Sequence, residues 1–179
     1  MKILFIGDIV GKVGRQAIQN RLPSLRKKYK PDFVIANGEN LAHGLGITPK
    51  TMRSMLEAGV DFFTSGNHIY DKKNEALKIF KDKKLSEKII RPANYRTRKP
   101  GEGAKIISNG KQKLLVINLC GQVFIRGDFT SPFKKFDKIY KEFADKKFNA
   151  VFVDFHTETT SEKLALAHYI KNRASVLIG

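Results

Sequence analysis

The sequence predicts an α/β fold in which apolar strands alternate with amphipathic helices and most strands run parallel. Short apolar runs recur along the chain, and each ends at a glycine or a polar residue, which is typical of buried strands. Between them lie segments with apolar residues at three- and four-residue steps, which indicate helices that cover a sheet. The chain of 179 residues has no evident internal repeat or linker, so we expect one domain over residues 1–179.

The first half of the chain contains three expected strands and three expected helices. The strands are expected over residues 2–7, 33–36 and 61–65, and the helices over residues 14–29, 48–58 and 72–83. Pro23 is expected to kink or split the first helix, because proline removes a backbone hydrogen bond. Thr48 is expected to cap the second helix, with Pro49 at its first position and Gly59 just past its end.

The second half continues the alternation. Strands are expected over residues 88–92, 105–108, 113–120, 150–155 and 174–178, and a helix that begins near Pro132 is expected over residues 131–147. The segment Thr159–Glu162 fits a capping box, which predicts a second helix that extends to Asn172. Residues 94–103 are rich in turn-forming residues and are expected to form a surface loop.

Polar side chains capable of binding metal follow several of the expected strands. They are Asp8, Glu39 and Asn40, Asn67 and His68, Asn118 and Cys120, and His156. Ligands of open α/β sheets bind outside the carboxyl ends of the strands, so these residues are candidates for one shared site. Carboxylates, amide oxygens and imidazoles together suit Mn, Fe or Zn.

Each of these residues also has a simpler interpretation. Asp8 could cap a helix or stabilise a turn, and Glu39 and Asn40 follow an Asn-Gly turn signal and could be solvated turn residues. His68 and His156 could be structural or surface residues. The repeated placement of such residues after strands favours the shared site.

The net charge of +17 comes mostly from lysine. A basic surface can attract nucleic acid or phosphorylated ligands. The alternative is a lysine-rich composition without a specific partner, and the spread of the lysines along the chain favours it. A dedicated nucleic-acid surface more often carries arginine interleaved with aromatic residues.

The single cysteine, Cys120, excludes a disulfide within the chain. No apolar run approaches the ~18 residues of a membrane span, and the apolar run after Lys2 is too short for a signal peptide. We therefore expect a protein of the reducing cytoplasm without membrane contact. The sequence also lacks a phosphate loop, an H-E-x-x-H zinc motif and the G-x-S-x-G motif of serine hydrolases.

Four motifs carry a resemblance to a known family. They are GDIVG at residues 7–11, NGEN at residues 37–40 with His43-Gly44, GNH at residues 66–68, and DFHTETTSEK at residues 154–163. Together, and in this order, they resemble the YmdB-like branch of the calcineurin-type metallophosphoesterases, a hydrolase superfamily. The resemblance covers the whole chain, and Val10 stands where many related phosphoesterases have a histidine, as expected for this branch.

The resemblance implies an αββα sandwich with a dinuclear metal site and phosphodiesterase activity. The implied metal ligands are Asp8, Glu39, Asn40, Asn67 and His156, with Glu39 as the bridging ligand and His68 as the general acid. Two divalent or trivalent ions are implied, with Fe or Mn expected and Zn or Mg as alternatives. Phosphoesters, cyclic nucleotides among them, are the implied substrates.

The family pattern continues with a Gly-Thr-His-Thr-His-type segment that supplies two further histidine ligands, whereas this sequence ends at Gly179. We therefore expect the C-terminal part of the fold to be missing and the activity to be weakened by truncation. The competing hypotheses are a non-catalytic basic protein that binds phosphate or RNA without sequence preference, and a fragment that depends on self-association. We expect a homo-oligomer.

Overall fold

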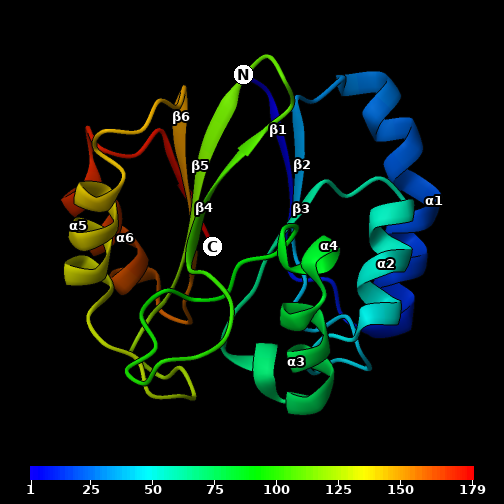
Figure 1. Cartoon of the computed structure of the whole chain (residues 1–179), viewed down its shortest axis with the longest axis horizontal. Helices are drawn as coiled ribbons and strands as arrows, with labels where there is room; N and C mark the ends of the chain where they lie inside the picture. The colour runs from blue at the N-terminus through cyan, green and yellow to red at the C-terminus, as the bar shows by residue number, and fades with distance from the viewer. The chain divides into compact units, whose positions relative to one another are not determined.

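The α/β fold class is confirmed by a computed structural model that describes residues 1–179. The chain forms two compact units, Met1–Ile89 and Ile90–Gly179, and each contains one β-sheet with its own helices (Figure 1). Each unit is described below by itself.

The sheet of the first unit has three parallel strands in the order β1 (Ile3–Ile6), β2 (Phe33–Asn37) and β3 (Phe62–Thr64). All residues of β2 and β3 are buried, as expected for apolar runs that are covered on both faces. In the register of the sheet, Ile6 pairs with Ala36 and Asn37 pairs with Thr64. The three carboxyl ends therefore meet at one edge.

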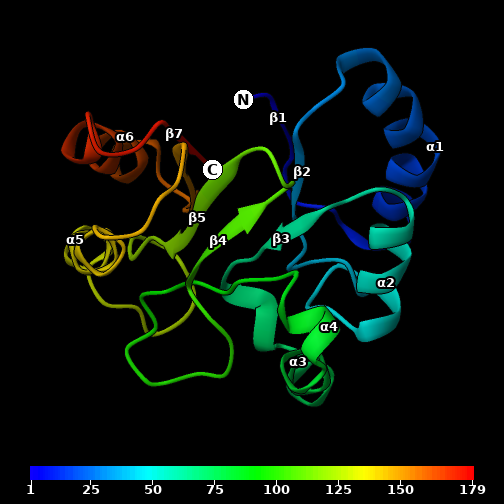
Figure 2. The same cartoon turned by 45° about the horizontal axis from the view of Figure 1, so that its top comes forward.

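The helices of the first unit are α1 (Gly11–Tyr29), α2 (Pro49–Glu57), α3 (Lys73–Lys81) and α4 (Lys83–Ser86), and the 3₁₀ helix η1 (Asn67–Tyr70) follows β3. Helices α1 and α2 lie side by side next to the sheet (Figures 1 and 2). They bury Leu22 of α1 and Met52 and Met55 of α2 in the core.

Helix α1 continues through Pro23 without splitting, and it begins earlier than expected, at Gly11. The cap of α2 is confirmed, because the Thr48 hydroxyl accepts a hydrogen bond from the Thr51 amide at 3.2 Å and Pro49 is the first helical residue.

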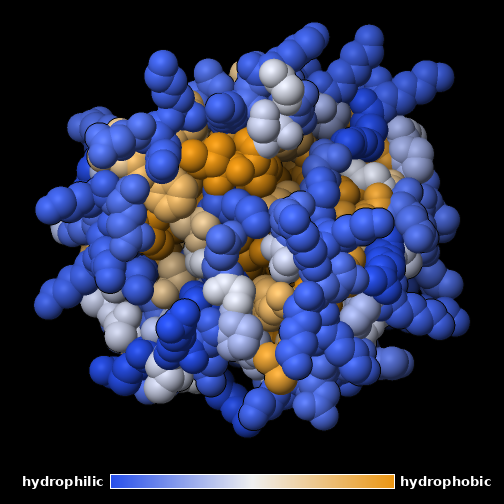
Figure 3. Space-filling model, viewed as in Figure 1, coloured by the Kyte–Doolittle hydropathy of each residue, from blue (hydrophilic) through white to orange (hydrophobic).

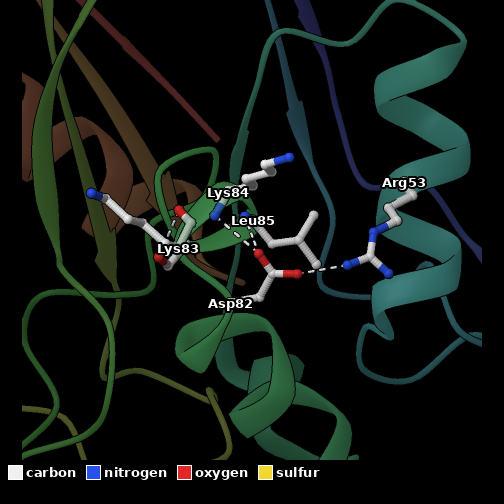
Figure 4. A network of polar contacts seen from close by, with 6 residues as sticks. Arg53, Asp82, Lys83, Lys84 and Leu85 are labelled. Carbon is white, nitrogen blue, oxygen red and sulfur yellow. Dashed lines mark hydrogen bonds and ion pairs between the residues drawn. The ribbon is translucent and has the colours of Figure 1, made fainter.

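The helix expected over residues 72–83 is instead divided into α3 and α4 at Asp82. Asp82 has an extended backbone, and its carboxylate accepts hydrogen bonds from the amides of Lys84 and Leu85, so it caps α4 (Figure 4). The same carboxylate pairs with Arg53 of α2 at 2.6 Å, as Figure 4 also shows. Asp82 thus ends one helix, starts the next and ties both to α2.

The prediction of a strand over residues 88–92 is wrong. Ile89 forms only an isolated bridge with Phe63, and Pro92 lacks the N–H that a longer ladder would need.

The sheet of the second unit has four strands in the order β4 (Ala104–Ser108), β5 (Lys113–Cys120), β6 (Ala150–His156) and β7 (Val176–Ile178). Strand β4 is antiparallel to β5 and the other pairs are parallel, so the expectation of largely parallel strands holds with one exception. The expected loop over residues 94–103 contains no helix or strand.

Helices α5 (Pro132–Glu142) and α6 (Thr160–Ile170) pack on one face of this sheet (Figure 1). Alternate residues of β5 and β6 contribute one side of the core, namely Leu115, Ile117, Leu119, Val151, Val153 and Phe155. The helices contribute Phe136, Ile139, Leu166 and Ile170. Helix α5 is shorter than the expected helix over residues 131–147.

The prediction of a capping box at Thr159 is wrong. The Thr159 side chain makes no capping hydrogen bond at α6. The Glu162 carboxylate turns instead towards the loop after β5, where it accepts hydrogen bonds from the amides of Gln122 and Val123. It also accepts one from the Thr157 hydroxyl at 2.9 Å.

Hydrophilic side chains dominate the periphery of the face shown in Figure 3, which agrees with the net charge of +17. No helix of the structure is both long enough and apolar enough to cross a membrane.

Replacing Asp137 tests the contact between α5 and the end of α6. Its carboxylate accepts hydrogen bonds from the Tyr169 hydroxyl and the Arg173 guanidinium, both at 2.6 Å. The Tyr169 hydrogen bond, followed by that of Arg173, holds the pKa of Asp137 below its ordinary value of 3.8. Since the folded pKa is the lower one, the stabilisation is present above that ordinary value and is lost as the pH falls through the folded pKa.

We therefore expect Asp137→Asn to lower the free energy of unfolding at neutral pH by less than about 1 kcal/mol, because the site is solvent-exposed. The difference from the wild type should shrink at acid pH. Urea unfolding of both proteins at several pH values measures it, and Asp145→Asn, at an exposed position of the same unit, is the control. A difference that persists unchanged at acid pH would contradict this explanation.

Candidate metal centre

Three of the loops that leave the first sheet carry the predicted site residues. Asp8 follows β1, Glu39 and Asn40 follow β2, and Asn67 opens η1 after β3. Because the strands are parallel and adjacent, these loops all begin at the same edge of the sheet.

The turn after β2 is fixed by its own hydrogen bonds. The Asn37 side chain accepts from the Glu39 amide at 3.1 Å, and the Gly38 amide donates to the Thr64 carbonyl at 3.0 Å. Gly38 also leaves room for a neighbouring side chain, because a Cβ there would lie 2.9 Å from Cδ1 of Phe63. The packing of Gly38 against Phe63 of β3 and the hydrogen bond to the Asn37 side chain together fix the turn from which Glu39 and Asn40 project.

The orientation of Asn40 is the most informative feature of the site. Its side-chain nitrogen donates to Oδ2 of Asp8 at 2.7 Å and to Oε1 of Glu39 at 3.4 Å. Its Oδ1 is buried and has no hydrogen-bond partner. A buried acceptor without a partner costs about 1–3 kcal/mol, so Oδ1 is placed where a cation or a water could satisfy it.

Glu39 connects the second and third loops. It is almost fully buried, with 1% of its surface exposed, and Oε2 accepts a hydrogen bond from the His68 amide at 2.9 Å. A buried carboxylate is expensive unless it is hydrogen-bonded or bound to metal. Hydrogen bonds therefore link Asp8, Asn40, Glu39 and the backbone of His68 in series.

The imidazole of His68 has a partner that the sequence did not predict. Its Nδ1 lies 2.6 Å from Oδ2 of Asp71, which follows η1. The spacing of the two residues on one helical turn was the only sequence signal for this pair. With Nδ1 directed at Asp71, Nε2 is the ring nitrogen left for a ligand or substrate.

The other predicted residues lie in the second unit. His156 is at the end of β6, where it pairs with Cys120 of β5. Asn118 and Cys120 belong to the buried part of β5, and the side-chain nitrogen of Asn118 donates to the Asp154 carbonyl at 3.3 Å. Asn118 thus supports the sheet, whereas the role of His156 as a ligand stays a prediction.

The donors of the first unit fit a hard or borderline divalent cation. The chain contains no group of three or more His, Cys, Asp and Glu side chains arranged to hold a metal, so a cation here would need the amide oxygen of an asparagine. The Asn40 oxygen, held in place by Asp8 and Glu39, meets that need. Asp8 and Glu39 would also offset the charge of the cation.

The YmdB-like protein family model matches residues 4–179. This chain belongs to the YmdB-like family. The membership predicted from the motifs is therefore confirmed.

Named relatives and solved structures match along nearly the whole chain. A 2′,3′-cyclic-nucleotide 2′-phosphodiesterase of Bacillus subtilis is 44% identical over 179 residues, which is all of this chain and 66% of that protein. A hypothetical protein of Thermus thermophilus has a crystal structure that matches with a TM-score of 0.87 at 38% identity, covering 99% of this chain and 66% of that one. A crystal structure described as a novel phosphatase of Mycoplasma pneumoniae matches with a TM-score of 0.85 at 34% identity, covering 97% of this chain and 61% of that one. This YmdB-like chain thus spans about two thirds of the length of these relatives.

Substituting Gly38 tests whether the turn after β2 depends on close packing. We expect Gly38→Ala to lower the free energy of unfolding by about 1–3 kcal/mol, because the new methyl group overpacks against buried Phe63. Chemical denaturation measures the effect. Gly7→Ala is the matched control, since a Cβ at Gly7 meets nothing within 4 Å. Equal stability of the two variants would show that the turn tolerates a side chain.

Proposed function

We propose that this chain is a metal-dependent phosphoesterase that hydrolyses phosphodiesters, cyclic nucleotides among them. The observation that carries the proposal is the buried Oδ1 of Asn40, which has no partner and belongs to an amide aligned by Asp8 and Glu39. The names of the relatives support the same class of reaction, since the B. subtilis protein is a 2′,3′-cyclic-nucleotide 2′-phosphodiesterase.

The metal ligands proposed in the first unit are Asp8, Glu39, Asn40 and Asn67, and His156 is the ligand proposed in the second. Two bound cations would stabilise the negative charge of the reacting phosphate and lower the pKa of a water molecule. We propose Fe or Mn, because the donors are oxygens and imidazoles without thiolate.

The proposed role of His68 is to protonate the leaving oxygen. Hydrolysis forms a bond between the oxygen of water and phosphorus and breaks one P–O bond, and the departing oxygen needs a proton. Asp71 orients the imidazole through Nδ1, so Nε2 would deliver that proton. The hydrogen bond from the His68 amide to Glu39 ties the position of this residue to the metal-binding turn.

Replacing His68 tests this role. With Mn²⁺ in excess, we expect the chain to hydrolyse bis(p-nitrophenyl) phosphate and a 2′,3′-cyclic nucleotide. We expect His68→Ala to lower kcat by about 10²–10⁴-fold with little change in KM. Asp71→Asn should lower kcat by less, because the imidazole keeps one polar neighbour.

The control is His168→Ala, which removes an exposed imidazole from α6. It should leave turnover unchanged. A chain without phosphodiesterase activity under these conditions would refute the proposed function, and unchanged turnover in His68→Ala would refute the assignment of the acid.

A further inference from the structure

The second unit carries two loops that are joined to each other, residues 94–101 and residues 121–129, which we call the loop pair. The Arg96 amide donates to the Asp128 carbonyl at 3.0 Å, and the Arg96 guanidinium pairs with the Asp128 carboxylate at 2.7 Å. Tyr95 and Phe129 form a β-bridge, and their rings lie 4.6 Å apart. These contacts give the loop pair a defined shape although it contains no helix or strand.

Phe124 extends from the loop pair into solvent. Its exposed fraction of 87% is unusual for a phenylalanine, and its φ of +60° is a left-handed conformation that costs free energy in a bulky residue. A folded chain gains nothing internally from an exposed aromatic ring on a strained backbone. Strain of this kind gathers at binding and catalytic sites.

The backbone beside Phe124 is anchored by Glu162 of α6. The Glu162 carboxylate accepts hydrogen bonds from the amides of Gln122 at 2.9 Å and Val123 at 3.3 Å. A Cβ at Gly121 would collide with Glu162 and Thr157, so the loop approaches this anchor as closely as glycine allows. Phe124 is therefore an exposed ring on a fixed support, which reduces the entropy lost when a ligand stacks on it.

The charge of the loop pair is positive. It contains Arg96, Arg98, Lys99 and Arg126, and residues 88–101 contain no aspartate or glutamate. The carboxylate of Asp128 is already paired with Arg96. Lysine is spread along the rest of the chain, whereas arginine and aromatic residues gather here. This surface therefore favours an anionic ligand.

Two cavities next to the loop pair extend this positive surface. Arg91, Arg98 and Lys99 line a cavity of about 450 Å³ together with Pro100 and Gly101. Arg91 also lines a second cavity, of about 260 Å³, with Lys135 and Lys138 of α5 and the carboxylates Glu102 and Glu142. Burial, and then the charges of Lys138 and Arg91, lower the pKa of Lys135. Lys138 pairs with Glu142 at 3.9 Å, so the second cavity adds less net positive charge than the first.

We infer that the loop pair binds single-stranded nucleic acid, for which RNA is the probe used below, with a base stacked on Phe124 and phosphates contacted by Arg98 and Arg126. An aromatic platform beside cationic side chains is the arrangement by which proteins hold single strands without sequence preference. A series of cationic groups that extends over two adjacent cavities suits several linked phosphates better than one. A second copy of this chain is a poorer partner for the loop pair, because both copies would bring the same positive side chains to the contact.

The experiment measures binding of a fluorescent single-stranded RNA of about ten nucleotides to the full chain by anisotropy. EDTA is present, so that binding is independent of the proposed phosphoesterase reaction. We expect Phe124→Ala to weaken binding about fivefold or more, and Phe124→Trp to restore it. Tyr29→Ala, which removes an exposed ring from the first unit, should have no effect.

The arginines are tested by salt dependence. The double variant Arg98→Gln/Arg126→Gln should reduce the slope of log K against log salt by about 1.4, which corresponds to two lost phosphate contacts. Lys146→Gln/Lys147→Gln removes the same charge from exposed positions of the same unit and should change the slope much less. Thermal unfolding followed by circular dichroism establishes that each variant is folded.

Three outcomes would overturn the inference: equal binding by Phe124→Ala and the wild type, equal slopes for the two double variants, and complete displacement of the RNA by AMP at matched phosphate concentration. The last would identify a mononucleotide site. A change from dimer to monomer in Phe124→Ala without loss of RNA binding would assign the ring to self-association instead.

Discussion

The parallel pairing of β1, β2 and β3 is the constraint on which the candidate metal centre depends. A parallel sheet places the carboxyl end of each strand at the same edge, so the pairing of the strands alone brings together residues that are far apart in the sequence. The central strand β2 is buried along its whole length and fixes the register of both neighbours. A shift of one residue would reverse every side chain of a strand between the two faces of the sheet. The turn that carries Glu39 and Asn40 begins directly after Asn37, the last paired residue of β2.

The same turn buries two polar groups, of which one has no partner within the chain. The Glu39 carboxylate is buried and accepts hydrogen bonds from Asn40 and the His68 amide, whereas the Oδ1 of Asn40 is a buried acceptor without a partner. The unsatisfied Oδ1 costs free energy, and a cation would turn that cost into binding energy. The polar network from Asp8 to His68 is therefore better explained by a ligand than by the stability of the fold.

The sequence predicted most of the fold because its local signals agree with the tertiary structure. Apolar runs identified the strands, and Thr48 with Pro49 identified the start of α2. The prediction of a strand at residues 88–92 was wrong because an apolar segment near a proline can be buried without joining the hydrogen-bond ladder of a sheet. The prediction of a capping box at Thr159 was wrong because the Glu162 carboxylate accepts hydrogen bonds from the amides of Gln122 and Val123 instead. These donors are distant in the sequence, so no local pattern reveals them.

The residues of the candidate site were predicted by type and position, and the contacts that orient them were not. Asp8, Glu39 and Asn40 follow strands, as expected, but the direction of the Asn40 amide depends on its contacts with both carboxylates. Asp71 was missed because an aspartate near a histidine on a polar turn is common. Phe124 was missed because neither its exposure nor its left-handed backbone leaves a signal in the sequence.

The cation proposed at the edge of the first sheet would bind through the oxygen of Asn40. Calorimetric titration of Mn²⁺ into the chelator-treated chain tests it most directly, with Asn40→Ala compared with Asn20→Ala on the exposed side of α1. We expect the wild type and Asn20→Ala to bind Mn²⁺ alike and Asn40→Ala to bind it at least about tenfold more weakly. Equal Mn²⁺ affinity and stoichiometry in Asn40→Ala and the wild type would show that the Asn40 oxygen is not a ligand.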